Sequence, residues 1–345
     1  MTVPREGPRE RLTVAVRPLR SKHNAFVNRF SSCVENSRFS AVPFSWRRLM
    51  HYDVVIFHWP NEFFASQPLR VRWESTLKLF LLYFARRVVG LRVIWIAHNA
   101  QPHDIENPAR SARHFLSALD GIVHLSQHSC ALLGTQYDLS PRTRQVVIVH
   151  GHYRDDAITR PQPFVAPKRE VHLVYFGQLR PYKGVEELVG CIAQLQDTGV
   201  RLKVVGLVQD EPTAARVKEM ARVVPNIQLD LRQEPLSDAE LETAVDDAHA
   251  VVLPYRRILN SGAALYAMSR NRMLLAPRQG SLPELQTVVG EQWVHLYDEA
   301  LTVTALRAFV AAVRAGPDGA TADLSAFEWG GIAEKIQSLL GTLMP

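Results

Sequence analysis

Short apolar runs alternate with amphipathic stretches along most of the chain, and this alternation predicts the secondary structure. Uninterrupted apolar, β-branched runs are typical of strands buried on both faces of a parallel sheet, and the amphipathic stretches between them are typical of covering helices. We therefore predict an α/β fold. The expected strands are residues 12–16, 54–58, 93–98, 121–125 and 146–149, followed by 171–176, 202–205, 227–229, 250–253, 273–276 and 293–296.

A proline-rich segment divides this pattern into two parts. Residues 160–169 contain three prolines, and we interpret the segment as a linker. A chain of 345 residues with 47% hydrophobic content can bury two cores. We expect one domain over residues 1–160 and another over residues 161–345, and leave open that the last helix packs back on the first domain. Ligands of parallel sheets bind at the carboxyl ends of the strands, which predicts a site in the cleft between the domains.

The segment from residue 175 to 184, Tyr-Phe-Gly-Gln-Leu-Arg-Pro-Tyr-Lys-Gly, joins an expected strand to an expected helix. A glycine at position 177 lets backbone approach a ligand closely, and the free N–H groups of a helix N-terminus attract anions. Arg180 and Lys183 add fixed positive charge. By itself the segment fits a strand-to-helix turn with two solvated cations equally well, but it also fits a site for a diphosphate.

A second segment, residues 251–277, repeats the arrangement of strand, loop and helix. Asn260 and Ser261 are good N-cap residues, and the small residues Gly262 and Ala263 leave room for a ligand at the first helical turn. Two such helix N-termini in one α/β domain are what binding a nucleoside diphosphate requires. We therefore favour a nucleotide site over two ordinary α/β turns.

Histidines gather where three expected strands of the first half end. An isolated histidine is most often structural, but this clustering with acidic side chains favours a polar active site. The residues are His58, His98, His103, His150 and His152, with Glu62, Asp104 and Asp155 beside them. The chain has no His-Glu-x-x-His, and its His-x3-His at residues 124–128 straddles a strand end, so we expect no catalytic metal.

Charge is distributed unevenly along the chain. Residues 1–160 contain 22 Lys and Arg against 12 Asp and Glu, whereas residues 161–345 contain 18 against 22. In the basic half, residues 69–91 form an expected helix whose broad apolar face is flanked by arginines. Such a helix suits the surface of an anionic membrane, although it also fits a core helix with solvated cations. Its expected apolar face comprises Trp73, Leu77, Phe80, Leu81, Phe84 and Val88, and it is flanked by Arg70, Arg72, Lys78, Arg86 and Arg87.

Other features of the sequence limit the candidate binding partners and the cellular compartment of the protein. Basic clusters at residues 46–48 and at Arg20 with Lys22 compete with this helix for the membrane-facing role. No zinc finger, aromatic RNA-binding signature or lysine-rich tail is present, so we expect no nucleic-acid partner. Three widely spaced cysteines indicate a reducing compartment. The sequence has neither a signal peptide nor an apolar run of about eighteen residues, which predicts a cytoplasmic protein that does not span a membrane.

Taken together, these motifs resemble the GT-B glycosyltransferases and, within them, the xanthan-type exopolysaccharide β-1,4-mannosyltransferases of glycosyltransferase family 94. The resemblance covers residues 52–297 and rests on several motifs that are weak singly. They are Tyr-Asp-Val-Val-Ile-Phe-His-Trp-Pro (52–60), His-Asn-x-x-Pro-His-Asp (98–104), His-Gly-His-Tyr-Arg-Asp (150–155), Phe-Gly-x-x-Arg-Pro-Tyr-Lys-Gly-Val-Glu (176–186), Leu-Pro-Tyr with Asn-Ser-Gly (253–262) and Val-Gly-x-x-Trp-Val-x-Leu-Tyr (289–297).

The resemblance implies two Rossmann-like domains that face a central cleft. It also implies a GDP-mannose donor, a polyprenyl-diphosphate-linked oligosaccharide acceptor, inversion at the anomeric carbon, no metal, and peripheral attachment to the inner face of the cell membrane. The donor-binding residues would be Gly177, Arg180, Lys183, Tyr255, Asn260, Ser261, Gly262, Ala263 and Glu284. Of these, Glu284 would meet the ribose or cap its own helix.

The chain departs from the large retaining GT-B family that has a related C-terminal motif. That family places Glu-x7-Glu near the donor, whereas Ile258 and Tyr266 occupy these positions here. Gln178 stands where that family has an arginine after the strand glycine. These departures favour inversion at the anomeric carbon, and they do not identify the nucleobase of the donor. A retaining enzyme with another nucleotide sugar, or a sugar-nucleotide-binding protein without activity, remains the alternative.

The expected mechanism follows from charge. Arg180 and Lys183, both expected to be solvent-accessible, would stabilise the departing diphosphate together with the N–H groups near Ser261. Inversion also needs a general base near the acceptor hydroxyl, from the first domain. Our first choice is Asp104, which could instead cap a helix, with His103 or His98 orienting it, and Glu62 is the rival. We expect His58, His150 and His152 to line the cleft.

Overall fold

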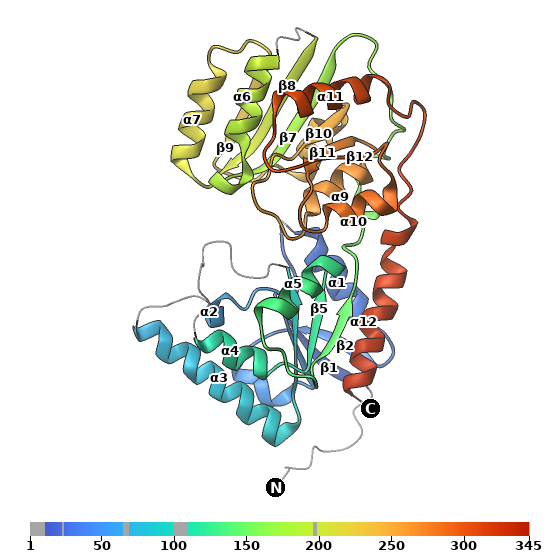
Figure 1. The fold of residues 1–345 in the computed structure, drawn as a ribbon. Coiled ribbons are helices and arrows are strands. Elements are labelled where there is room, and N and C mark those ends of the chain that lie inside the picture. The colour runs from blue at the N-terminus through green and yellow to red at the C-terminus, as the bar shows by residue number, and fades with distance from the viewer. Residues whose placement is uncertain (1–10, 23, 65–68, 99–109, 196–198, 345) are drawn as a thin grey trace. The chain divides into compact units, whose positions relative to one another are not determined.

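The computed structural model describes residues 11–22, 24–64, 69–98, 110–195 and 199–344 (Figure 1). Its contacts divide the chain into two compact units. Unit 1 comprises residues 1–151 and 327–345, and unit 2 comprises residues 152–326. Each unit contains a six-stranded sheet in which all paired strands are parallel. The predicted α/β architecture is confirmed.

The sheet of unit 1 has the strand order β2-β1-β3-β4-β5-β6. Its strands are β1 (Leu12–Arg17), β2 (Phe39–Pro43), β3 (Val54–Phe57), β4 (Arg92–Ala97), β5 (Gly121–His124) and β6 (Arg144–Val147). The helices are α1 (Ala25–Val34), α2 (Asn61–Phe64), α3 (Leu69–Val89), α4 (Arg110–Ser117), α5 (Gln127–Gln136) and α12 (Trp329–Leu343), with a 3-10 turn η1 at Trp46–His51.

The sheet of unit 2 has the strand order β12-β11-β10-β7-β8-β9. Its strands are β7 (Val171–Leu179), β8 (Val200–Val208), β9 (Ile227–Arg232), β10 (Ala250–Val252), β11 (Met273–Pro277) and β12 (Val294–Tyr297). The helices are α6 (Val185–Leu195), α7 (Glu211–Ala221), α8 (Asp238–Asp246), α9 (Gly262–Ser269), α10 (Leu282–Val289) and α11 (Val303–Arg314). Short 3-10 turns are η2 (Arg154–Asp156), η3 (Pro181–Lys183) and η4 (Ser325–Phe327).

All eleven expected strands are present, and the structure adds β2, which the apolar pattern did not predict. This strand pairs only with β1 at the edge of its sheet, and Phe39 is its one buried residue. An edge strand buries less apolar surface than a central strand, so its sequence carries a weaker apolar signal. Polar N-caps fix several helix starts, as expected from local sequence. Side-chain caps come from Asn24, Ser126, Asp210, Ser237, Ser261 and Thr302.

The last helix returns to unit 1. Helix α12 packs against α1 and β6, and Figure 1 shows it beside α1. Its apolar face joins a core that contains Phe26 and Phe30. The buried residues of this face are Trp329, Ile332, Ile336, Leu339, Leu340 and Leu343. Gly151 makes room for Trp329, because a Cβ atom at Gly151 would lie 2.3 Å from the indole ring.

Residues 152–160, which the sequence pattern assigned to the first domain, belong to unit 2 in the structure. Polar contacts explain this. The carboxylate of Glu242 accepts a hydrogen bond from the Thr159 N–H (2.9 Å), and the guanidinium of Arg270 donates to the Thr159 carbonyl (2.8 Å). Arg270 is 1% exposed and forms an ion pair with Asp246. A buried arginine is tolerated when its donors are satisfied, as they are here by oxygen partners on several segments.

No helix within the described ranges combines the length and the apolar character that crossing a bilayer requires.

Candidate functional site

Two loops of unit 2 lie at the carboxyl edge of its sheet. One follows β7 and contains η3, and the other follows β10 and contains Pro254, Tyr255 and Arg256. Strands β7 and β10 are paired in parallel, so both loops leave the sheet at the same edge. These are the two segments that the sequence nominated for a diphosphate.

Direct contacts join the two loops into one surface. The backbone N–H of Arg256 donates to the Tyr182 carbonyl (2.9 Å), and the Arg256 guanidinium forms a close ion pair with Glu187 in the first turn of α6. Gly184 has φ +67°, and a Cβ atom there would lie 1.9 Å from the Pro254 carbonyl oxygen. Only glycine therefore permits this approach of the two loops.

Lys183 sits at the junction of the loops. Its Nζ atom lies 3.7 Å from the ring centroid of Tyr255 and 5.4 Å from that of Tyr182. The pKa of Lys183 is lowered to about 8, chiefly by burial; Tyr182 opposes the shift, and the charge of Arg180 adds to it. Lys183 and Arg180, which were expected to be solvent-accessible, are half-buried and so retain partial access to solvent. The rings of Tyr255 and Tyr182 cover part of Lys183.

The N-terminus of α9 completes the edge. The Ser261 hydroxyl accepts a hydrogen bond from the Ala264 N–H (3.1 Å) and also bonds the side chain of Tyr255. Asn260, Ser261, Gly262 and Ala263 are all half-buried, so a ligand can reach the first turn. Free N–H groups at such a turn attract anions.

Two further predicted donor residues lie near the same edge. Glu284 is half-buried in the first turn of α10, whose N-cap residue Ser281 donates its N–H to the Leu259 carbonyl (2.8 Å). Thus the start of α10 contacts the segment that leads into α9. Gly177 is exposed in β7 with φ +134°, a conformation that favours glycine.

In unit 1, the histidines of two neighbouring strands meet. His58 follows β3 and His98 follows β4, and these strands are paired in parallel. His58 Nδ1 lies 2.9 Å from His98 Nε2, and the two rings stack with centroids 5.2 Å apart. Trp59 stacks on His98 at 4.7 Å, while Phe26 contacts His98 edge-on at 5.3 Å.

His150 joins this cluster through Phe26, because the ring centroids of Phe26 and His150 lie 4.4 Å apart. Burial lowers the pKa of His58 to about 3 and that of His150 to about 4, and it holds the pKa of His98 well below its usual value. All three imidazoles are therefore neutral at neutral pH. The structure thus brings together three of the predicted histidines, His58, His98 and His150.

The remaining predicted residues have different surroundings. Glu62 forms a close ion pair with Arg17, so its carboxylate is already engaged by a cation. His152 belongs to unit 2, where its Nδ1 accepts a hydrogen bond from the Arg154 N–H (3.3 Å). Asp104 and His103 lie outside the described residues. In the described part of the chain, no group of three or more His, Cys, Asp and Glu side chains is arranged to hold a metal ion.

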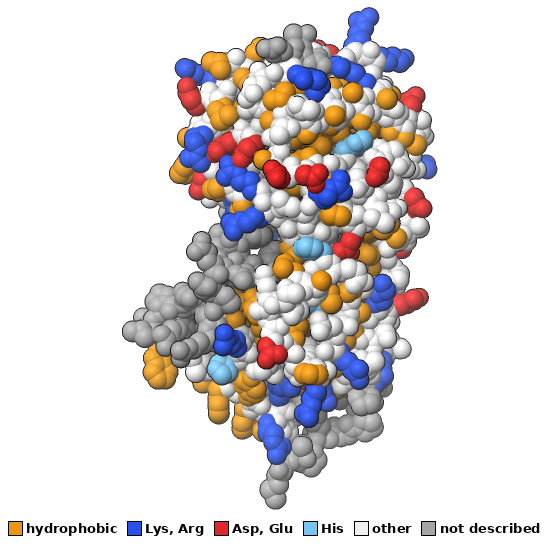
Figure 2. Space-filling model, in the orientation of Figure 1, with side chains coloured by type: hydrophobic (Ala, Val, Ile, Leu, Met, Phe, Trp, Pro, Cys, Tyr) orange, Lys and Arg blue, Asp and Glu red, His pale blue; other side chains and the backbone are white. Residues whose placement is uncertain are grey.

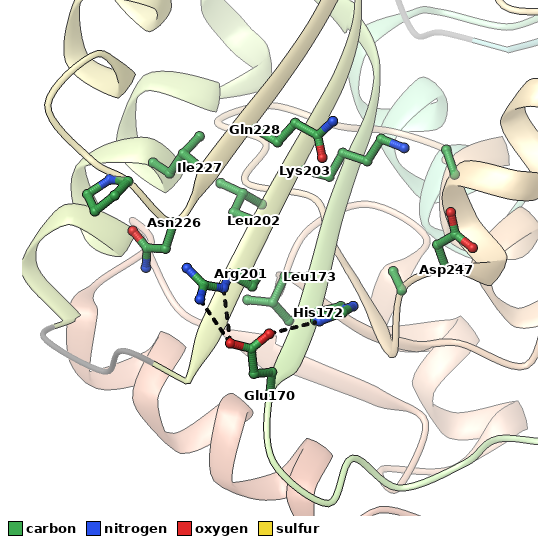
Figure 3. Close-up of a pocket in the computed structure, with 13 residues that line it drawn as sticks. Glu170, His172, Leu173, Arg201, Leu202, Lys203, Asn226, Ile227, Gln228 and Asp247 are labelled. Atoms are coloured by element: carbon green, nitrogen blue, oxygen red, sulfur yellow. Dashed lines mark hydrogen bonds and ion pairs between the residues drawn. The ribbon is translucent and has the colours of Figure 1, made fainter.

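A cavity of about 660 Å³ opens at the opposite, amino edge of β7, β8 and β9 (Figure 3). Figure 3 shows Glu170 between Arg201 and His172, with oxygen-to-nitrogen distances of 2.9 and 3.5 Å. This cavity therefore does not belong to the surface formed by η3 and α9, and its charged groups are partly paired with one another. The sequence motifs gave no indication of it.

Two residues of the loop junction escaped the sequence analysis. Arg256 directly follows the Leu-Pro-Tyr motif, and Glu187 follows the quoted Val-Glu pair, so both stood next to segments already singled out. Their pairing was not predictable, because a contact between residues so distant in sequence depends on the order of strands in the sheet.

Known proteins resemble this chain in sequence and in fold. It is 31% identical over 284 residues to the GDP-mannose:glycolipid 4-beta-D-mannosyltransferase of Xanthomonas campestris pv. campestris, an alignment that covers 81% of this chain and 77% of that protein. A second X. campestris protein with the same name gives the same identity and coverage. No protein-family model matches the chain.

Two solved structures illustrate the similarity in fold. The sucrose-phosphate synthase tll1590 from Thermosynechococcus elongatus superposes with a TM-score of 0.61 at 17% identity, covering 85% of this chain and 74% of that one. Anabaena Alr3699/HepE in complex with UDP also gives a TM-score of 0.61, at 12% identity, covering 89% of this chain and 86% of that one. At such identities the similarity establishes the fold alone.

Proposed function

The chain belongs to the family of the GDP-mannose:glycolipid 4-beta-D-mannosyltransferases, and on this premise we propose that it transfers mannose from GDP-mannose to a glycolipid acceptor. The GT-B glycosyltransferase resemblance read from the motifs is confirmed by this membership and by the two parallel sheets. The finer features below are our proposals.

The donor site is proposed at the joined loops of unit 2. The observation that carries this proposal is the convergence of Lys183 and the capped N-terminus of α9 on one side chain, Tyr255. When GDP departs, negative charge develops on its diphosphate. A lysine ammonium and oriented N–H groups stabilise such charge without a metal ion. Arg180, half-buried beside them, would add a second cation.

The acceptor is proposed to be a polyprenyl-diphosphate-linked oligosaccharide of exopolysaccharide biosynthesis, with inversion at the mannose anomeric carbon. In an inverting transfer, the acceptor hydroxyl attacks the anomeric carbon from the face opposite GDP, and a base takes its proton. We propose that this base comes from unit 1. Asp104 remains the first candidate, with His103 or His98 orienting it. The ion pair of Glu62 with Arg17 speaks against Glu62 as a proton acceptor.

Attachment to the inner face of the cell membrane is proposed through α3. The side chains of Trp73, Phe80 and Phe84 are 76%, 63% and 48% exposed, and the Phe80 and Phe84 rings stack on each other. The opposite side of the helix supplies Leu82 and Ala85 to the core. Figure 2 shows apolar side chains protruding at the lower left, where Figure 1 places α3.

This exposed aromatic stripe is more typical of a helix at a membrane interface than of a helix in a protein core. The guanidinium of Arg86, one of the flanking cations, binds the Asp120 carboxylate and the Ala118 carbonyl, so it is already engaged within unit 1. Arg87 is exposed on the same helix, and Lys78 lies 5.9 Å from the Trp46 ring. Because Arg86 is engaged within unit 1, the aromatic stripe of Trp73, Phe80 and Phe84 is the feature to test.

The test of the proposed reaction supplies the purified protein with GDP-mannose and a bacterial lipid extract. We expect mannose to appear on a lipid-linked product in the β configuration, as read from the anomeric coupling by NMR. An α-configured product would show a retaining enzyme. Failure to transfer mannose from GDP-mannose, with transfer from another nucleotide sugar, would show that the donor is wrong.

A further inference from the structure

We propose that Tyr255 is a positioning residue that holds Lys183 and the N-terminus of α9 at the separation a diphosphate needs. The inference rests on the proposed donor site and deepens it, because it assigns the assembly of that site to one side chain. A positioning residue acts through the groups it holds rather than by reacting itself.

Tyr255 makes two different contacts with two different elements. Its ring face lies 3.7 Å from the Lys183 ammonium, which belongs to η3. Its hydroxyl shares a hydrogen bond with the Ser261 side chain, the cap of α9. Tyr255 is itself only 3% exposed, so its ring has little freedom to move. One rigid side chain therefore fixes the distance between the two groups proposed to bind the diphosphate.

The nature of the contact with Lys183 matters for ligand binding. In the described part of the chain, Lys183 forms no ion pair, whereas the neighbouring Glu187 carboxylate is engaged by Arg256. An aromatic face attracts an ammonium group but carries no charge of its own. A diphosphate can therefore take up the ammonium without separating it from a carboxylate. Tyr255 thus keeps Lys183 in place and available to an anion.

The charges around Lys183 make the arrangement measurable. Arg180 and Tyr182 on its own segment act on the charge of Lys183, and Tyr255 on the facing loop contacts it. On α6, the nearest turn contributes Glu187, whose carboxylate is paired with Arg256. Because burial lowers the pKa of Lys183 to about 8, part of the ligand-free protein has a neutral Lys183 at pH 8.5. Affinity for GDP should accordingly fall as the pH rises through about 8.

Two substitutions separate the two contacts. Tyr255→Phe keeps the ring beside Lys183 and removes the bond to Ser261, whereas Tyr255→Leu removes both. Calorimetry would measure the affinities for GDP and GMP between pH 6.5 and 9.5, and transfer assays would give KM and kcat. GMP is the comparison because a single phosphate does not need both halves of the site. Tyr137→Phe, which alters a buried tyrosine in unit 1, is the matched control.

In Tyr255→Phe we expect the GDP affinity to fall about tenfold, in line with the loss of a hydrogen bond near a charged ligand, while the pH step near 8 persists. In Tyr255→Leu we expect a larger fall, a displaced pH step and a GDP-to-GMP affinity ratio close to one. KM for the donor should rise more than kcat falls. If Tyr255→Leu does not fold, as judged by its melting temperature, Tyr255→Phe alone decides the matter.

The inference is overturned if Tyr255→Phe keeps the GDP affinity of the parent, or if a folded Tyr255→Leu keeps the GDP-to-GMP ratio and the pH step of the parent, while Lys183→Ala loses GDP affinity. That result would leave the proposed donor site intact. If Lys183→Ala also binds GDP as the parent does, the donor site itself is wrong. The two failures are therefore distinguishable.

Discussion

Burial lowers the pKa of several side chains in this protein, so that their protonation differs from that of the same side chains in water. His58, His98 and His150 are kept neutral by desolvation, and Lys183 is brought close to its neutral form at mildly alkaline pH. In both cases the cost of burying charge changes the protonation state at a site that the sequence also singled out. The consequence that we expect is a pH dependence of stability.

We expect unit 1 to lose stability in mild acid. The unfolded chain binds protons on its histidines near pH 6.5, whereas the folded chain holds the pKa of His58 at about 3 and that of His150 at about 4. Between these values the unfolded state binds more protons, so the free energy of unfolding falls as the pH drops from 6.5 towards 4. Each histidine contributes about 1.4 kcal/mol per pH unit. Urea unfolding at a series of pH values measures this slope.

His58→Phe removes one of these titrating groups and should make the slope shallower between pH 6.5 and 4. Substitution of the exposed His128 by Ala provides the control and should leave the slope unchanged. An equal slope in the parent and in His58→Phe would mean that His58 is already protonated in the folded state.

At the residue scale, the sequence predicts which groups gather but not how they touch. The meeting of His58 and His98 could be expected, because both residues follow apolar runs that become neighbouring strands. The contact of Lys183 with Tyr255 could not be predicted, because it depends on β10 lying next to β7 in the sheet. Asp104, the first-choice base, stays a prediction.

Elements differ in how fully the apolar pattern determines their surroundings. Central strands bury both faces, so their apolar runs predicted them well, whereas the edge strand β2 was missed. Helix α3 shows a second limit. Its apolar period predicted a helix, but both the buried Leu82 and the exposed Phe80 belong to apolar positions, and the sequence alone does not say which of these faces the sheet.

The turn between β7 and α6 depends on one glycine, and Gly184→Ala should therefore abolish GDP binding. The alanine would need a positive φ and would place its Cβ atom against the Pro254 carbonyl, so the two loops must separate. Gly134→Ala is the control, because nothing lies within 4 Å of a Cβ atom there and alanine favours helix α5 by about 1 kcal/mol. GDP titration and melting temperatures report both effects, and undiminished GDP affinity in Gly184→Ala would refute the joined-loop site.

The aromatic stripe of α3 should carry the protein onto anionic membranes. Replacing Trp73, Phe80 and Phe84 together by Ser should reduce co-sedimentation with phosphatidylglycerol vesicles while leaving GDP affinity and the melting temperature almost unchanged, because these side chains are exposed. Salt should weaken the binding of the parent by screening its cations.

Val223→Ser tests whether any exposed apolar residue has this effect, since Val223 is 76% exposed, as Trp73 is, but belongs to unit 2. Equal vesicle binding by the triple variant and the parent would show that the stripe serves another purpose.

At the scale of the whole molecule, the chain is divided unequally between its units. Unit 2 is one continuous segment with a complete six-stranded sheet, whereas unit 1 needs both ends of the chain. The predicted proline-rich linker at residues 160–169 lies within unit 2, and the contacts of Thr159 with Glu242 and Arg270 hold the preceding residues there as well. Such tertiary contacts cannot be predicted from the amino-acid composition of the segment.

Residues 152–326 should fold when produced alone and should bind GDP, whereas residues 1–151 alone should not fold. Without α12, unit 1 would lack six buried apolar side chains, which together represent on the order of 10 kcal/mol, comparable with the whole stability of a domain. Circular dichroism and GDP titration of the two fragments test this. Addition of a peptide spanning residues 327–345 should restore folding to the first fragment, and a well-folded fragment 1–151 would contradict the prediction.

The return of α12 also has a consequence for synthesis on the ribosome. Domains generally fold as they emerge, the N-terminal domain first. Here the first unit to be made cannot close its core until the last residues of the chain have left the ribosome, because Ile336, Leu340 and Leu343 belong to that core. Unit 2 can fold while the nascent unit 1 still waits for its final helix. A prematurely terminated chain would therefore carry a finished unit 2 attached to an unfinished unit 1, and protein quality control would recognise the exposed apolar surface of unit 1.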